Sequence, residues 1–210
     1  MERLLRILIL SFYFPPDLSA GSFRTSALVE AFKKLERPEL TVDVITTQPN
    51  RYSQIAQSVE PFEDFGWLRI NRITLPSHKS GMRDQALAFA AFSKGALSLA
   101  KQEKWDVVYA TSSRLMTAAL GAKIAKQKNI PLYLDIRDLF SDTMEDVLRN
   151  RKMSNLLSFF KWLEKRTFRK ASHINVVSEG FLNHIGESTS RGKCSVFTNG
   201  IDDIFLETDF

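Results

Sequence analysis

The chain has 210 residues, a formal net charge of +5 and a single cysteine, Cys194. A lone cysteine excludes an intramolecular disulfide and a thiolate metal site and favours a reducing compartment, and no apolar run reaches the roughly 20 residues that a membrane-spanning helix needs. Because 44% of the residues are hydrophobic, the sequence predicts a globular chain with a large packed core.

Short apolar segments alternate with helix-periodic segments along the chain. Leu4–Leu10 is the first predicted strand. Arg3 and Arg6 give this segment some likeness to a signal peptide, but Glu2 and the prolines that soon follow favour a strand. The further predicted strands are Thr41–Thr46, Leu68–Leu75, Val107–Thr111, Leu132–Ile136, Ile174–Val177 and Cys194–Phe197. Several of them are continuously apolar, which is typical of strands covered on both faces.

Helical periodicity fills the stretches between these strands. It is found in 23–35, Gln85–Ala100, Leu115–Ala125 and Leu156–Phe168. The alternation predicts an α/β fold with a doubly wound, mainly parallel sheet in one domain. Gln48–Gly66 is polar and lacks a clear period, so we expect a long surface excursion there, with or without a short helix.

Polar side chains follow most of the predicted strands at their carboxyl ends, where open α/β sheets bind ligands. They are Ser11, Thr46, Thr47, Thr111, Ser112, Ser113, Asp135, Arg137, Asp138, Ser178, Glu179, Thr198 and Asn199. Serine and threonine at such positions are also ordinary helix caps and turn formers. Asp135 and Arg137 are harder to explain in that way.

The segment after the first strand, SFYFPPDLSAGSFR, places an arginine in the first turn of a predicted helix. A cation is disfavoured there unless a negative group accompanies it. Gly21 would let the backbone approach a ligand, Ser22 and the following N–H groups could donate to an oxyanion, and Arg24 would add a full charge. The alternative is that Gly21 only forms a turn and Arg24 pairs with a surface carboxylate.

Four segments together resemble a known family. ILILSFYFPPDLSAGSFRTSALVEAF, YLDIRDLFSD, NVVSEGF and FTNGIDDIF occur in the order and at the approximate spacing seen in retaining glycosyltransferases of family 4, which have the GT-B fold. The chain resembles their N-terminal, acceptor-side domain, particularly in the branch that builds bacterial capsular, O-antigen and exopolysaccharide chains.

The resemblance implies one half of a GT-B architecture, in which a second Rossmann-like domain binds the nucleotide-sugar. We therefore expect residues 1–203 to form the Rossmann-like acceptor-side domain and 204–210 to begin the interdomain connection of a truncated protein. The C-terminal donor domain would be absent, and the isolated domain would be inactive.

The resemblance also implies roles for particular residues. Gly21 matches the glycine of the N-terminal loop near the donor phosphates or the acceptor, and Arg24 follows it. Arg137 stands where many relatives have a histidine, so the general base stays unassigned, and Arg137 and Asp138 are the catalytic candidates. The substrate-binding candidates are Gly21, Ser22, Arg24, Asp135, Ser178, Glu179 and Asn199. From residue types alone, Asp135 could equally bind an acceptor hydroxyl, cap a helix or pair with Arg137.

The implied function is transfer of a sugar from a nucleotide-sugar to a saccharide or lipid-linked acceptor in cell-surface polysaccharide synthesis. We expect no cofactor and no metal, because His78, His173 and His184 lack ligand spacing. The alternatives are a stand-alone nucleotide- or phosphate-binding Rossmann module and half of a sugar-nucleotide epimerase. SFYFPPDLSAGS has one glycine, which disfavours a dinucleotide site, and the sequence gives little sign of a nucleic-acid partner.

A basic amphipathic helix is predicted over the segment RKMSNLLSFFKWLEKRTFRKA. Helical spacing puts Phe159, Phe160, Leu163 and Thr167 on one side and Lys161, Lys165 and Arg169 on the other. One interpretation is that the apolar side packs on the sheet and the cations are solvated. The other is peripheral contact of a cytoplasmic protein with the inner face of the membrane, near a lipid-linked acceptor.

Overall fold

The computed structural model describes residues 4–50, 59–76, 81–112, 115–139, 154–186 and 188–200. The strands are β1 (Leu5–Leu10), β2 (Leu40–Thr47), β3 (Phe62–Asp64), β4 (Leu68–Ile73), β5 (Val107–Ser112), β6 (Leu132–Ile136), β7 (His173–Val176) and β8 (Cys194–Val196). The helices are α1 (Ala20–Lys34), α2 (Met82–Gln102), α3 (Leu115–Lys128), α5 (Ser154–Lys170) and α6 (Gly180–Gly186), with a 3-10 turn η1 (Arg191–Lys193).

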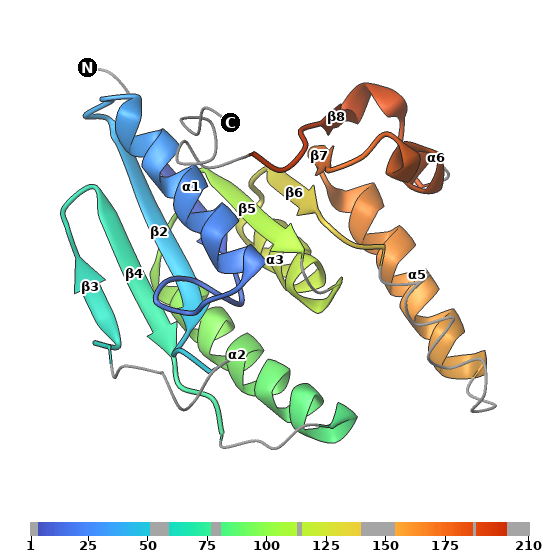
Figure 1. Cartoon of the computed structure of the whole chain (residues 1–210), viewed down its shortest axis with the longest axis horizontal. Helices are drawn as coiled ribbons and strands as arrows, with labels where there is room; N and C mark the ends of the chain where they lie inside the picture. The colour runs from blue at the N-terminus through green and yellow to red at the C-terminus, as the bar shows by residue number, and fades with distance from the viewer. Residues whose placement is uncertain are drawn as a thin grey trace, which may run out of the picture.

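The strands form one eight-stranded sheet in the order β3-β4-β2-β1-β5-β6-β7-β8 (Figure 1). Every neighbouring pair is parallel except β3 and β4. The chain builds outward from β1 to β2 and β4, and then returns to add β5 to β8 on the other side of β1. This Rossmann-like topology confirms the predicted fold class, and it places a topological switch point between β1 and β5.

The continuous apolar run of β1 is explained by helices on both faces of the sheet. Ile7 and Ile9 join the core cluster under α1, whereas Leu8 and Leu10 join the larger cluster under α2 and α3. Gly121 of α3 brings this helix close to β5, because a Cβ atom there would lie 2.7 Å from the Cβ of Ala110. Both faces of the central strands are therefore tightly packed.

The excursion predicted for Gln48–Gly66 contains a strand that the sequence pattern did not reveal. β3 pairs antiparallel with β4, with Phe62 opposite Asn71 and Asp64 opposite Arg69. Gly66 has a φ of +81° and donates its N–H to Asp64 Oδ1 at 2.8 Å, which closes the hairpin. Three residues are too few for an alternating pattern to stand out. Residues 51–58 lie outside the described part of the chain.

A buried ion cluster ties the strands together at their amino ends. Asp43 of β2 is 2% exposed and accepts from Arg6 Nε and Arg69 Nε at 2.7 Å each and from Trp105 Nε1 at 2.5 Å. Glu103 accepts from Arg6 Nη2 at 2.7 Å. Burial raises the pKa of the Asp43 carboxyl despite these donors, because desolvation outweighs their effect. The cluster lies away from the carboxyl ends of the strands.

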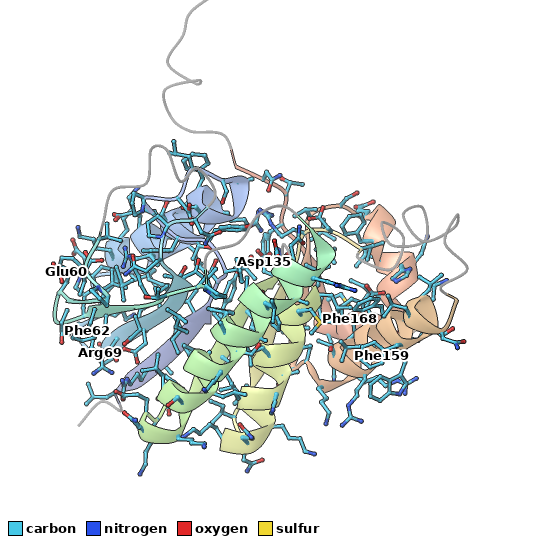
Figure 2. The ribbon with its side chains drawn as sticks, turned by 90° about the horizontal axis from the view of Figure 1, so that it is seen from below. Glu60, Phe62, Arg69, Asp135, Phe159 and Phe168 are labelled. Atoms are coloured by element: carbon cyan, nitrogen blue, oxygen red, sulfur yellow. The ribbon has the colours of Figure 1, made fainter. Side chains whose placement is uncertain are left out.

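Helix α5 buries part of the side that was expected to face the core, since Thr167 is buried and Phe160 and Leu163 are half-buried. Glu164, Thr167 and Phe168 are buried, and Glu164 Oε1 lies 2.8 Å from His184 Nε2 of α6. Phe159, which the helical spacing placed on the apolar side, is 49% exposed. Figure 2 labels both phenylalanines of α5, Phe159 and Phe168, in the same part of the molecule.

Candidate functional site

The loop after β1 leads directly into a capped helix. Ser19 is the N-cap of α1, and its side chain accepts from the N–H of Ser22 at 3.2 Å. Gly21 lies in the first helical turn, and its carbonyl accepts from Thr25 Oγ1 at 2.7 Å. Ser22 is fully buried, and its Oγ has no hydrogen-bond partner among the described residues. Because α1 follows β1, its first turn lies at the carboxyl edge of the sheet.

Three hydrogen bonds from neighbouring strands and the segment after β2 hold this loop in place. Thr47 Oγ1 donates to the carbonyl of Phe12 at 2.7 Å, and Arg72 Nη2 donates to the carbonyl of Pro15 at 2.8 Å. The N–H of Asn50 donates to Asp17 Oδ1 at 3.1 Å. The loop backbone is thus held from β2, from β4 and from the segment after β2.

Arg24 and Asp135 form a two-point ion pair at the centre of this edge. Arg24 Nε donates to Asp135 Oδ2 and Arg24 Nη2 to Asp135 Oδ1, each at 3.1 Å. The Asp135 side chain is fully buried and that of Arg24 is 21% exposed. Figure 2 places Asp135 near the middle of the molecule, far from the β3 edge marked by Glu60 and Phe62. The carboxylate that Arg24 pairs with is therefore a buried one from β6.

The sheet register brings a second polar residue to Asp135. Asp135 of β6 pairs with Asn175 of β7, which pairs with Ser195 of β8. Asn175 Nδ2 donates to Asp135 Oδ1 at 2.7 Å, while Asn175 Oδ1 accepts from the N–H of Phe197 at 2.9 Å and from Ser195 Oγ at 3.3 Å. One buried amide thus connects the carboxylate to the chain that leaves β8.

Arg137 adds a second guanidinium to the group. Its Nη2 donates to Asn199 Oδ1 at 2.7 Å, and its Nε lies 3.6 Å from Asp135 Oδ2. Its Nη1 is buried and has no hydrogen-bond partner among the residues that the structure describes. Burial lowers the pKa of Arg137 from its usual value, and Asp135 partly opposes this shift. Asp138, the next residue, is exposed.

Asn199 and the backbone beside it also contact Arg24. Arg24 Nη1 donates to Asn199 Oδ1 at 3.1 Å and to the carbonyl of Thr198 at 3.3 Å. We define the cation cluster as Arg24, Arg137, Asp135, Asn175 and Asn199. It contains two guanidinium groups and one carboxylate, so it carries one excess positive charge. Such an arrangement can bind an anion that reaches the carboxyl edge of the sheet.

A row of aromatic rings lies beside the cation cluster on the same face of the sheet. The rings of Tyr109 and Tyr133 stack with centroids 5.3 Å apart, and His173 stacks on Tyr133 at 5.0 Å. Burial, together with the negative charge of Asp135, raises the pKa of Tyr109. His173 Nε2 lies 3.0 Å from Ser195 Oγ. These rings pack against one another on the face of the sheet that carries Asp135.

The structure brings some of the predicted site residues together and leaves others apart. Arg24, Asp135, Arg137 and Asn199 are in mutual contact, as described above. Ser178 and Glu179 are exposed in the turn before α6, where Ser178 Oγ accepts from the N–H of Gly180 at 3.3 Å. No hydrogen bond or ion pair joins either of them to the cation cluster in the described ranges.

Two members of this network were not predicted from the sequence. Asn175 and Ser195 contact or extend the cluster through the sheet register. The available signal was the polar pair His173 and Asn175 at alternate positions of an otherwise apolar strand. Within the described residues, no group of three or more histidine, cysteine, aspartate or glutamate side chains could hold a metal ion. No helix in that part of the chain combines the length and apolar character that crossing a membrane requires.

The chain spans about half the length of several solved structures that have a similar fold. The chain is similar to Arabidopsis thaliana UGT89C1 complexed with UDP (TM-score 0.56, 15% identity, 94% of this chain and 49% of that one). It is also similar to Anabaena Alr3699/HepE in complex with UDP-glucose (TM-score 0.52, 15% identity, 98% of this chain and 46% of that one). A UDP-N-acetylglucosamine 2-epimerase is similar with a TM-score of 0.55 and 15% identity, and the match covers 93% of this chain and 46% of that one.

At these identities the solved structures support the fold alone, and no curated protein matches the sequence. The family comparison is more specific. Residues 27–204, most of the chain, match the model of the family described as Glycosyltransferase Family 4. This range includes β2 to β8 and four members of the cation cluster, namely Asp135, Arg137, Asn175 and Asn199. The chain therefore belongs to Glycosyltransferase Family 4, as its four sequence segments predicted.

Proposed function

We propose that this chain is the acceptor-side half of a retaining glycosyltransferase, which moves a hexosyl group from a nucleotide-sugar to a saccharide or lipid-linked acceptor in cell-surface polysaccharide synthesis. Family membership supports the transferase class. Two of the similar structures hold UDP or UDP-glucose, which makes a nucleotide-sugar a plausible donor here. Donor binding would be completed by a second domain, as expected from the resemblance.

The observation that carries the proposal is the excess positive charge of the cation cluster. Sugar transfer forms a bond between the acceptor oxygen and the anomeric carbon and breaks the bond from that carbon to the diphosphate. The departing diphosphate gains negative charge as the bond breaks, and the proton that the acceptor hydroxyl loses passes to the departing diphosphate or to solvent water. Cations and N–H groups that are already in position stabilise such charge most effectively. Arg137 Nη1 is a buried donor without a partner among the described residues, so it is the group best suited to this task.

We propose separate roles for the candidate residues on the basis of their burial and contacts. Asp135 is fully buried and occupied by Arg24 and Asn175, so we assign it to positioning the two arginines. Asp138 is exposed at the same edge, so we assign it to hydrogen bonding with an acceptor hydroxyl. The N–H groups of the first turn of α1, including Gly21 and Ser22, would add positive partial charge for the donor phosphates.

The test is transfer activity of the native full-length protein carrying Arg137→Gln. Loss of one charged donor to the leaving group is expected to lower kcat by about 10²- to 10³-fold, because comparable donors in other enzymes contribute that much. Arg37→Gln is the matched control, because Arg37 is an exposed arginine whose side chain pairs with Glu39 on the surface. Full kcat/KM in the Arg137 variant, with transfer confirmed for the unmodified protein, would contradict the assignment.

A second candidate follows from the similarity to UDP-N-acetylglucosamine 2-epimerase. Incubating the native protein with UDP-N-acetylglucosamine, with and without a saccharide acceptor, distinguishes the two reactions. Appearance of the 2-epimer without acceptor favours an epimerase, whereas acceptor-dependent release of UDP favours the transferase. A native mass near 24 kDa together with nucleotide binding would instead favour a stand-alone binding module.

The proposal includes a peripheral contact of a cytoplasmic protein with the inner face of the membrane through Lys161, Lys165 and Arg169. Lys165 and Arg169 are exposed on α5. Co-sedimentation with liposomes is expected to rise with their content of anionic lipid. Binding that does not respond to anionic lipid would count against this contact.

A further inference from the structure

A groove between α2, α3 and α5 lies on the face of the sheet opposite α1, away from the cation cluster. α3 lies against both α2 and α5, and Figure 2 shows α2 and α3 side by side with α5 beyond them. The groove measures about 640 Å³, which is within the usual size of small-molecule sites. Its apolar walls come from all three helices: Phe89, Leu97, Met116, Leu120, Phe159 and Leu163.

The charges in the groove are of one sign. Its lining residues include Lys123, Lys126, Arg166 and Lys170 and no aspartate or glutamate. These four cations lie in the second halves of α3 and α5, whereas Met116 and Phe159 lie in the first halves. The groove is therefore apolar toward one end and cationic toward the other.

A cationic hollow of about 530 Å³ adjoins this groove. Its lining residues are Trp162, Lys165, Arg166, Arg169 and Lys170. Arg166 and Lys170 line both the groove and the hollow. The guanidinium of Arg166 lies 5.4 Å from the centre of the Trp162 ring, which helps to orient it. The apolar groove thus leads into a cationic hollow whose lysines and arginines can bind a negative group.

The charge of the chain is concentrated on these three helices. They hold 11 of its 29 lysines and arginines but only two of its 24 aspartates and glutamates. The rest of the chain has more acidic than basic residues, so the positive charge belongs to this layer and not to the protein as a whole. An anionic ligand would be attracted to this side of the molecule.

We infer that this groove binds one anionic lipid, with its acyl chain along Phe89, Leu120 and Phe159 and its headgroup phosphate at Arg166 and Lys170. A sugar nucleotide has no chain to cover the apolar walls. A nucleic acid would need cations along the whole groove, whereas here they gather at one end. α3 and α5 begin at the carboxyl edge of the sheet and end at the opposite edge, so the headgroup site is remote from Asp135. This inference does not rest on the proposed transferase activity.

The experiment measures binding of dispersed single-chain lipids to the full chain by calorimetry, below their micelle concentration. The probes are lysophosphatidic acid and lysophosphatidylcholine with the same acyl chain, so that only the headgroup differs. We expect the anionic lipid to bind at about one molecule per chain and about tenfold or more tightly than the zwitterionic one. Equal affinities, or binding of neither lipid, would overturn the inference.

Two variants separate the chain site from the headgroup site. Ala119→Trp, in the wall of the groove, fills the apolar channel without changing charge, and Arg166→Gln with Lys170→Gln removes two headgroup contacts. Each variant is expected to weaken lysophosphatidic acid binding by about tenfold or more. Lys34→Gln is the matched control. Lys34 is an exposed residue of α1, so this variant should leave binding unchanged.

Three further outcomes would refute a lipid groove. The first is unchanged affinity in Ala119→Trp when circular dichroism confirms its fold. The second is binding to anionic vesicles without binding of the dispersed lipid. The third is tighter binding of an RNA oligonucleotide that both variants weaken. Nucleotide-sugar binding by the native protein is measured in parallel. Its failure would affect the proposed function alone, since the lipid assay contains no nucleotide.

Discussion

The Arg24–Asp135 pair allows a quantitative test of the cation cluster. The proposed perturbation is a double-mutant cycle of Arg24→Gln and Asp135→Asn. With N–O distances of 3.1 Å the charge centres lie about 4 Å apart, where the Coulomb energy is about 4 kcal/mol at an effective dielectric constant of about 20. Because Arg24 is 21% exposed, solvent reduces this value, and we expect a coupling energy of about 2–3 kcal/mol.

The single variants should differ in severity. Asp135→Asn leaves two arginines beside a neutral group and is expected to cost about 3–5 kcal/mol of the free energy of unfolding, because breaking a buried pair leaves uncompensated charge. Arg24→Gln should cost less, since Asn175 and Arg137 still contact Asp135. If Asp135→Asn does not fold, the single variants Arg24→Gln and Arg24→Lys are compared instead, because lysine keeps the charge but cannot donate two parallel hydrogen bonds.

Urea unfolding followed by tryptophan fluorescence measures the cycle, with constant m-values required for comparison. The Arg37–Glu39 pair serves as control and should give no measurable coupling, because Arg37 is 66% exposed. Raising the salt concentration from about 0.1 to 1 M should leave the Arg24–Asp135 coupling nearly unchanged, since a buried pair is screened weakly. A coupling below about 1 kcal/mol, or one that salt abolishes, would refute the view that this pair organises the site.

Two further predictions concern packing and pH. Gly121→Ala should lower the free energy of unfolding by about 1–3 kcal/mol despite better helix propensity, because the new Cβ would meet the Cβ of Ala110 at 2.7 Å. Thermal unfolding measures this change, and Gly186→Ala, which has open space around it, should be nearly neutral. The raised pKa of Asp43 means that the folded state holds its proton at a higher pH than the unfolded state, so this group favours folding at low pH. Wild type should therefore lose stability relative to Asp43→Asn as the pH rises above 3.8, the usual pKa of the group; a difference that stays constant between about pH 3.5 and 6.5 in urea titrations would contradict this.

Much of the sheet could be predicted from the sequence because its strands are buried on both faces. The four consecutive apolar residues from Ile7 to Leu10 in β1, and the mainly apolar stretches of β2, β5 and β6, indicate parallel strands. β3 has no such apolar run, because it lies at the sheet edge and consists of Phe62, Glu63 and Asp64, of which two are exposed. Its strand conformation comes from pairing with β4, a tertiary effect.

Four members of the cation cluster could be named from the sequence, but their contacts could not. Arg24 and Asp135 are 111 positions apart, and only the folded sheet brings the Arg24 side chain of α1 to Asp135 of β6. The expectation that Arg24 pairs with a surface carboxylate was therefore wrong, because its partner Asp135 is a buried carboxylate. The exposed position of Phe159 has a similar cause, since the side of α5 that faces the core is set by Phe168 and Glu164.

The bonds that fix the loop after β1 also affect the thermodynamics of ligand binding. Phe12, Pro15 and Asp17 are each held by a hydrogen bond from outside the loop before any ligand arrives. A loop that is already ordered gives up little conformational freedom on binding, so more of the interaction energy contributes to affinity. Calorimetry at this edge should accordingly find a small entropic penalty from the protein, and the heat of binding should depend mainly on the ligand and its water.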